Sequence, residues 1–311
     1  MAYSNLDGGR IDKGFSELLR WKFGDGAYVP KRRPVAPTPW VSNDGAALQG
    51  APRHALTWIG HASWLVQLGG RSLVVDPIWA EGLFIQKRAT RPGLTLDALP
   101  VIDAVLVTHN HRDHLDAPSL RALAERARAR GDAPPTFIVP LGVGAQLPRR
   151  LGPVVELGWW DHADVGDARV TLVPSEHWSQ RGPFDRNETL WGGFVVEADG
   201  QRVYHSGDTA YFAGFRDIGA RVGRIHAAML PIGAYEPRWF MKPQHMNPDD
   251  AVQAFLDLGA ERFVAMHWGT FKLTDEHLDE PPIRLREVLA ARDLGADGFA
   301  IPAVGETIAL R

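Results

Sequence analysis

The chain has 311 residues, a formal net charge of −3 at neutral pH and no cysteine. The absence of cysteine excludes disulfide bonds, thiolate nucleophiles and zinc sites built on cysteine. The near-neutral charge, without a long basic block, argues against nucleic acid as a partner. No stretch approaches the roughly 18 apolar residues of a membrane-spanning helix, and the N-terminus lacks an apolar secretion signal, so we expect a cytoplasmic protein.

The first part of the chain, residues 1–53, is predicted to be an N-terminal extension and linker ahead of one domain at 54–311. Apolar residues at helical spacing predict a short helix over 14–23, and basic residues follow at 31–33. This helix either docks on the core of the domain or makes a peripheral contact with an anionic membrane surface. The sequence leaves both alternatives open.

Paired strands dominate the predicted domain. Gly69-Gly70 and Asp199-Gly200 separate apolar runs and predict two hairpins. Asn247, followed by proline and two acidic residues, predicts a helix start, and Gly259 predicts its end. We predict strands at 64–68, 72–75, 104–107, 137–139, 154–157, 169–173, 194–197, 202–205, 227–232, 263–266, 298–301 and 307–310, and helices at 118–130, 248–258 and 283–292. This order indicates an α+β fold, a four-layer αββα sandwich of two sheets with helices outside.

A cluster of metal-binding side chains follows the strand at 104–107 in the run AVLVTHNHRDHLD. His109, His111, Asp113 and His114 lie within six residues on the turn that leaves this strand. Residues two apart on extended chain project to the same side, so the first two imidazoles can reach one ion. Asp116 and the proline after the next residue then predict a capped helix.

Three more candidate ligands, His177, Asp208 and His267, each follow a predicted strand. Seven ligands are too many for one ion but suit two ions that share a carboxylate. We assign the first ion to His109, His111 and His177, the second ion to Asp113, His114 and His267, and the bridging position to Asp208. Nitrogen and oxygen donors suit two Zn²⁺, and also accept Mn²⁺ or Fe. Two such ions lower the pKa of a shared water from ~16 towards ~7 and so supply a hydroxide nucleophile.

Other polar residues surround this set. His61 and Asp76 are either outer supports of the metal ligands or ordinary turn residues. His245, in the loop KPQHMNP, is a candidate substrate contact, as a phosphate ligand or as a proton donor. The long loop at 78–100 is a candidate binding loop. The other histidines are expected to be structural or solvated: His54, His162, His205, His226 and His277.

Five blocks of the sequence resemble the N-acylphosphatidylethanolamine-hydrolysing phospholipase D family of the metallo-β-lactamase superfamily. They are THNHRDHLD, PSEHWSQR, SGDTAY, PIGAYEPRWFMKPQHMNPDDAV and MHWGTFKLTDEHLDEPP. The resemblance extends from about Leu19 to Leu310, and the block at 231–251 is its most specific part. The resemblance implies a dizinc hydrolase that cleaves N-acylphosphatidylethanolamine to an N-acylethanolamine and phosphatidic acid.

By this resemblance, all seven assigned ligands match the metal ligands of the family, and Gln244 and His245 match its substrate contacts. Asp113, Asp208 and His245 are therefore the predicted catalytic residues. Arg112 stands where the animal enzymes typically have tyrosine. Because a guanidinium favours phosphate or another anion, we expect Arg112 to bind substrate together with Gln244 and His245.

The predicted function is therefore a phosphodiesterase of phospholipase D type, with a phospholipid or a small phosphodiester as substrate. One alternative keeps the dimetal site for a lactonase, or for another ester or amide hydrolase, as in the related sugar-phosphate lactonases. Another is a non-catalytic lipid-binding or scaffolding protein on the same fold. A homodimer is expected only from the general frequency of symmetric dimers.

Overall fold

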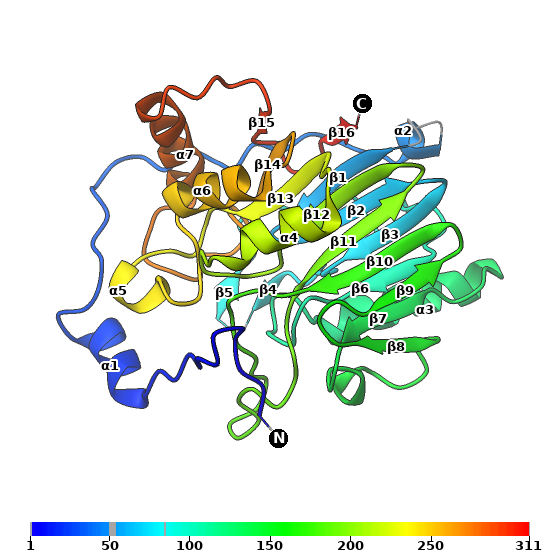
Figure 1. Ribbon diagram of the computed structural model, residues 1–311, viewed down its shortest axis with the longest axis horizontal. Coiled ribbons are helices and arrows are strands. Elements are labelled where there is room, and N and C mark those ends of the chain that lie inside the picture. Colours follow the sequence, from blue (N-terminus) through cyan, green and yellow to red (C-terminus); the bar gives the residue numbers. More distant parts are fainter. Residues whose placement is uncertain (1, 50–53, 84, 311) are drawn as a thin grey trace.

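The computed structural model describes residues 2–49, 54–83 and 85–310. Two seven-stranded sheets pack face to face, and helices cover their outer faces (Figure 1). This arrangement confirms the predicted four-layer α+β sandwich. In the described part of the chain, no helix is long and apolar enough to cross a membrane.

The first sheet has the strand order β16-β1-β2-β3-β6-β7-β8. Its side chains alternate between the two faces, as the period of two requires. Trp64, Val66 and Val75 enter the core between the sheets, whereas Leu65 and Val74 pack under helix α3 (Ala117–Arg130). The strands are β1 (Ala55–Gly60), β2 (Ser63–Leu68), β3 (Arg71–Val75), β6 (Ala104–Leu106), β7 (Thr136–Pro140), β8 (Val154–Leu157) and β16 (Thr307–Ala309).

The second sheet has the order β15-β14-β13-β12-β11-β10-β9. Helices α4 (Gly214–Val222), α6 (Pro248–Leu258) and α7 (Glu280–Ala291) lie on its outer side (Figure 1). The strands are β9 (His162–Val165), β10 (Ala168–Val173), β11 (Gly193–Ala198), β12 (Gln201–His205), β13 (Ala227–Pro231), β14 (Phe263–Met266) and β15 (Phe299–Ala300). Short elements complete the fold: β4 (Gly82–Leu83), β5 (Gln86–Lys87), α5 (Arg238–Met241) and a 3₁₀ turn at Gly144–Gln146.

Helix boundaries follow the predicted capping residues. The Asn247 side chain accepts a hydrogen bond from the Asp250 N–H at 2.9 Å, and Gly259 ends the helix in the left-handed conformation. Asp116 caps α3 in the same way. Helix α7 begins three residues before the predicted start at 283, because Pro281 and Pro282 fit its first turn, where no intrahelical N–H bond is lost.

The N-terminal residues pack along the domain. Helix α1 (Phe15–Phe23) is anchored by Trp21, which is 6% exposed, contacts Phe240 and donates its indole N–H to Asp275 at 2.8 Å. Further along, Arg33 forms a bidentate ion pair with Asp279. A short helix, α2 (Ala46–Gln49), follows, and the last predicted linker residues, 50–53, lie outside the described residues. Trp21 is therefore the one described residue of α1 that is buried, while the other large apolar residues of this helix remain exposed.

Candidate metal centre

The predicted ligands meet at one rim of the sandwich, where strands from both sheets end. Four of them occupy the turn between β6 and α3, and the others follow β10, β12 and β14. Strand β6 is parallel to β3 in the first sheet, and β12 and β14 are both parallel to β13 in the second sheet. The carboxyl ends of these strands therefore deliver their ligands to one rim of the sandwich. The structure thus brings together all seven residues: His109, His111, Asp113, His114, His177, Asp208 and His267.

Three imidazoles form the first group. The Nδ1 atom of His111 lies 2.9 Å from Nε2 of His109 and 3.2 Å from Nε2 of His177. All three rings are mutually in contact, with centroid separations of 4.5 to 5.1 Å. Three nitrogen atoms this close can hold one metal ion and leave a coordination position open.

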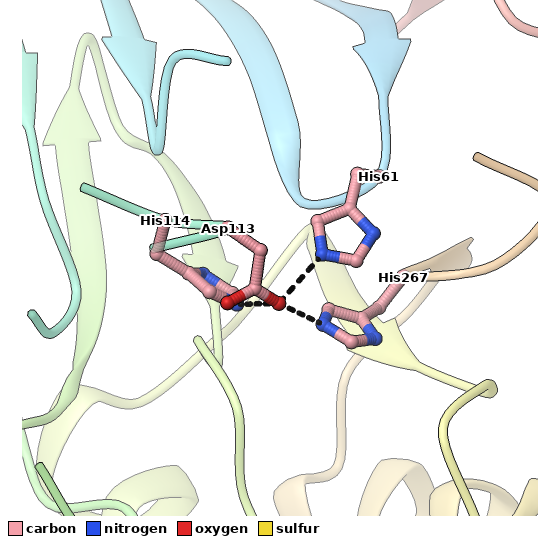
Figure 2. Close-up of side chains that lie close together, drawn as sticks. All are labelled: His61, Asp113, His114 and His267. Atoms are coloured by element: carbon pink, nitrogen blue, oxygen red, sulfur yellow. Dashed lines mark hydrogen bonds and ion pairs between the residues drawn. The ribbon is translucent and has the colours of Figure 1, made fainter. Parts of the chain in front are cut away.

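The second group centres on the Asp113 carboxylate (Figure 2). Its Oδ2 atom lies 3.6 Å from Nε2 of His114, 3.7 Å from Nε2 of His267 and 3.0 Å from Nε2 of His61. These four residues form a second set that could hold an ion. The first three are the predicted ligands of the second ion, and His61 is an additional neighbour.

Asp208 lies between the two groups. Its Oδ2 atom is 3.2 Å from Nε2 of His114 and 4.0 Å from Nε2 of His177, while Oδ1 is 3.1 Å from Nε2 of His267. One carboxylate therefore faces ligands of both groups, which is the arrangement expected of a bridging residue. The donor set contains nitrogen and oxygen only, so it fits two borderline or hard divalent ions.

Outer hydrogen bonds fix which ring nitrogen faces the centre. The His114 Nδ1–H donates to Asp76 at 2.7 Å, and the His177 Nδ1–H donates to the backbone oxygen of Gln244 at 2.9 Å. The His109 Nδ1–H lies 3.0 Å from the Thr108 hydroxyl, which itself donates to Asp76 at 2.7 Å. In each case the opposite nitrogen keeps its lone pair for a metal.

The charges of the two groups differ. Burial lowers the pKa of His111 to about 4 and that of His177 to about 3, so these imidazoles are neutral and able to ligate. Burial opposes protonation of His267 as well, but the Asp208 and Asp113 carboxylates together outweigh it and raise the pKa of this imidazole to about 9. Burial would raise the pKa of Asp208, yet His114 and His267 hold it well below its usual range. The Asp113 and Asp208 carboxylates both stay ionised, and divalent ions bound by these residues would supply the balancing positive charge in place of imidazole protons.

His61 and Asp76 take the first of the two roles considered for them, that of outer supports. His61 lies on the tight turn between β1 and β2, with a positive φ of 55°. Because a carboxylate only accepts hydrogen bonds, the neutral His61 ring donates Nε2–H to Asp113. Its ring also packs 4.0 Å from that of His267. The positioning of two second-group ligands therefore depends on His61, which the histidine motif does not include.

The substitution His61→Asn tests this positioning role. Asparagine tolerates positive φ, but its shorter side chain does not reach Asp113. We expect affinity for the ion of the second group to fall roughly 10–100-fold while the first group keeps its ion. Metal content after dialysis against graded chelator measures this, with the exposed His162→Asn as control. Retention of two ions at wild-type affinity would show that His61 does not position the ligands.

A groove with a volume of about 910 Å³ opens at the centre, and the three predicted substrate contacts line it. His245 places Nδ1 3.8 Å from Asp208, and burial lowers its pKa to about 3. Gln244 is buried and contributes its backbone oxygen to His177. Arg112 is exposed at the groove and donates to the Arg181 backbone oxygen at 3.3 Å.

The other histidines lie outside the two metal groups. His205 and His226 are buried and hydrogen-bonded to backbone groups, at 2.9 Å and 3.0 Å respectively. His277 contacts the Lys31 carbonyl at 2.9 Å, and His162 is exposed on β9. The predicted binding loop at 78–100 supplies Leu83, Ile85 and Gln86 to the groove.

Known proteins resemble the chain in sequence and in fold. Residues 71–268 match the family model described as the beta-lactamase superfamily domain. An uncharacterized protein of Mycobacterium tuberculosis is 36% identical, covering 99% of this chain and 82% of that protein. The N-acyl-phosphatidylethanolamine-hydrolyzing phospholipase D 1 of Caenorhabditis elegans is 35% identical over 80% of this chain and 74% of that protein. A metallo hydrolase of Ignicoccus hospitalis has the same fold, with a TM-score of 0.60 at 23% identity over 83% of this chain and 98% of that chain.

Proposed function

Because the chain belongs to the N-acylphosphatidylethanolamine-hydrolysing phospholipase D family of the metallo-β-lactamase superfamily, we propose that it is a dinuclear phosphodiesterase of phospholipase D type. The chain is a metal-dependent hydrolase of this superfamily. The proposal that it is a dinuclear phosphodiesterase is supported by the convergence of two ligand groups at the base of one groove.

We assign the first ion to His109, His111 and His177, the second to Asp113, His114 and His267, and the bridge to Asp208. Two Zn²⁺ held there would supply a hydroxide nucleophile at neutral pH and neutralise charge that develops on phosphoryl oxygens. The seven residues would hold both ions, and the hydrogen bonds that His114 and His177 donate to Asp76 and to the Gln244 carbonyl keep these imidazoles aligned.

His245 is assigned to the substrate phosphate as a neutral hydrogen-bond donor. It lies in the groove beside Asp208, within reach of a group bound at the centre. Burial lowers the pKa of His245 to about 3, so the ring is neutral and offers one N–H donor. This favours a phosphate contact over donation of a proton to the leaving alkoxide, the other role considered for this residue.

The walls of the groove support a lipid substrate. Phe15 and Trp21 of α1, Ile85 of the β4–β5 turn and Phe240 of α5 all line it. Phe15 is 73% exposed and Ile85 is 91% exposed, so the mouth offers apolar surface to acyl chains or to a bilayer. We therefore propose a phospholipid substrate reached by peripheral contact with a membrane.

Turnover by zinc-loaded protein tests the proposal. We expect cleavage of a short-chain N-acylphosphatidylethanolamine to an N-acylethanolamine and phosphatidic acid, measured by mass spectrometry, and loss of cleavage after removal of metal with a chelator. A soluble bis-aryl phosphodiester and a panel of lactones are run in parallel. Cleavage of the soluble diester alone would keep the phosphodiesterase and reject the lipid. A preference for lactones over both diesters would contradict the proposal and favour the lactonase.

A further inference from the structure

The wall of the groove on the His111 side is strongly cationic. Four basic residues line the groove, and its only carboxylates among the described residues are the metal-centre pair, Asp113 and Asp208. The four are Lys13, Arg112, Arg181 and Arg186. A single phosphodiester charge bound at two divalent ions leaves this additional positive charge without a counterpart in the substrate.

Lys13 is the most unusual of the four. Its Nζ atom is inaccessible to solvent, has no hydrogen-bond acceptor among the described residues and lies 3.8 Å over the Phe240 ring. The neighbouring Glu17 carboxylate instead accepts a hydrogen bond from the Gly14 N–H at 2.8 Å. Burial lowers the pKa of Lys13 to about 8, so the side chain is still mostly charged at neutral pH.

Lys13 is joined to the metal centre through two neighbouring side chains. Arg186 donates to the Lys13 backbone oxygen at 3.3 Å, and its guanidinium lies 4.4 Å over the Trp178 ring. Trp178 in turn packs 4.5 Å from the His111 ring. The indole N–H of Trp178 is a second buried donor without an acceptor among the described residues.

The arginines add a positive field but are held by other groups. Arg181 donates to the backbone oxygens of Asn110 and Leu115 at 3.2 and 2.9 Å. Arg186 donates to backbone oxygens and forms a 3.5 Å ion pair with the exposed Asp12. Lys13 has no such bond, so its ammonium group keeps all three N–H donors for an anion bound beside the Phe240 ring.

We propose that the groove contains a second anion subsite centred on Lys13, which lines the groove together with Trp178. The substrate would therefore be a phosphodiester that bears a second anionic group, a carboxylate or a phosphate, in addition to the bond that is cleaved. This inference rests on the proposed function and narrows its substrate class.

Two pairs of short-chain lipids test the subsite. N-hexanoyl- and N-glutaryl-phosphatidylethanolamine differ by a carboxylate, and phosphatidylinositol and its 4-phosphate differ by a phosphate. We expect the member with the second anion to have a KM lower by roughly tenfold or more in at least one pair, and the pair that responds identifies the group. Lys13→Met should abolish that preference by raising the KM of the doubly anionic member to that of its partner, and Lys13→Arg should retain it.

Lys22 is the matched control, because this lysine of α1 likewise places Nζ over an aromatic ring, 3.4 Å over Trp21, but does not line the groove. Lys22→Met should therefore keep the preference. Equal KM values within both pairs, or a preference that survives Lys13→Met, would overturn the subsite while the phosphodiesterase stands. If no lipid is hydrolysed the proposed function fails, and calorimetric binding of the same lipids to wild type and Lys13→Met still decides the subsite.

Discussion

Asp208→Asn is expected to abolish hydrolysis of every substrate that the wild type cleaves. Asp208 is the only described carboxylate within 4 Å of ligands from both metal groups, His177 on one side and His114 and His267 on the other. An amide of the same shape lacks the negative charge that binds two cations. Loss of several kcal/mol of charge stabilisation corresponds to a fall in kcat/KM of roughly 10³-fold or more.

The metal content of Asp208→Asn is a second measurement that tests this prediction, in addition to activity. We expect Asp208→Asn to retain fewer ions per chain than the wild type, with unchanged secondary structure by circular dichroism. Asp257→Asn is a suitable control, since Asp257 is a carboxylate that bonds to Tyr211 and Arg216 away from the centre. Near-normal activity in Asp208→Asn would show that this carboxylate does not bridge the ions.

Asp76→Asn is expected to damage both the fold and the metal centre. The buried Asp76 carboxylate accepts three hydrogen bonds of 2.7 Å, from the Thr108 N–H, the Thr108 hydroxyl and His114 Nδ1–H. Asparagine has one acceptor oxygen, so its amide nitrogen must face at least one of these donors. If the nitrogen faces His114, the ring takes the other tautomer and the Nε2 lone pair is lost. We expect about 2–4 kcal/mol of lost stability in the metal-free protein and roughly 10–100-fold weaker metal binding.

Urea unfolding of metal-free protein and competition with a chelating dye measure the two effects separately. Asp164→Asn is the control, because that side chain is 58% exposed and pairs only with Arg169 among the described residues. Its substitution should change stability by no more than about 0.5 kcal/mol. An Asp76→Asn variant with the wild-type urea midpoint and metal affinity would show that the outer hydrogen bonds do not hold the centre.

The sequence predicts the elements with strong local signals and misses those formed by packing. The two hairpins are confirmed because Gly69-Gly70 and Asp199-Gly200 adopt the positive φ values that tight turns need. Helix α4 is absent from the prediction, since its sequence contains two glycines, and it forms because Phe215 and Ile218 are buried beside α6. Strand β9 is likewise missed, because it is a largely exposed edge strand with little apolar pattern.

The candidate site likewise contains residues that the sequence predicts and residues that it misses. The histidine motif and the strand-end positions are enough to assemble all seven proposed ligands, since each lies next to a recognisable strand. Sequence spacing cannot show that Lys13 and Trp21 line the groove, because they lie more than 80 residues before the first ligand. Only the folding of the chain brings them to the groove. Long-range packing of this kind has no local signature.

Because α1 docks through Trp21, the metal ligands and part of the groove wall come from separate regions of the sequence. The ligands come from the sandwich, whereas part of the groove wall comes from a helix anchored by one buried aromatic residue and its bond to Asp275. Exchange of that helix can therefore alter which molecules are accepted while the reaction itself stays the same. In directed evolution, residues 13–23 are where a library should change selectivity at the least cost to catalysis.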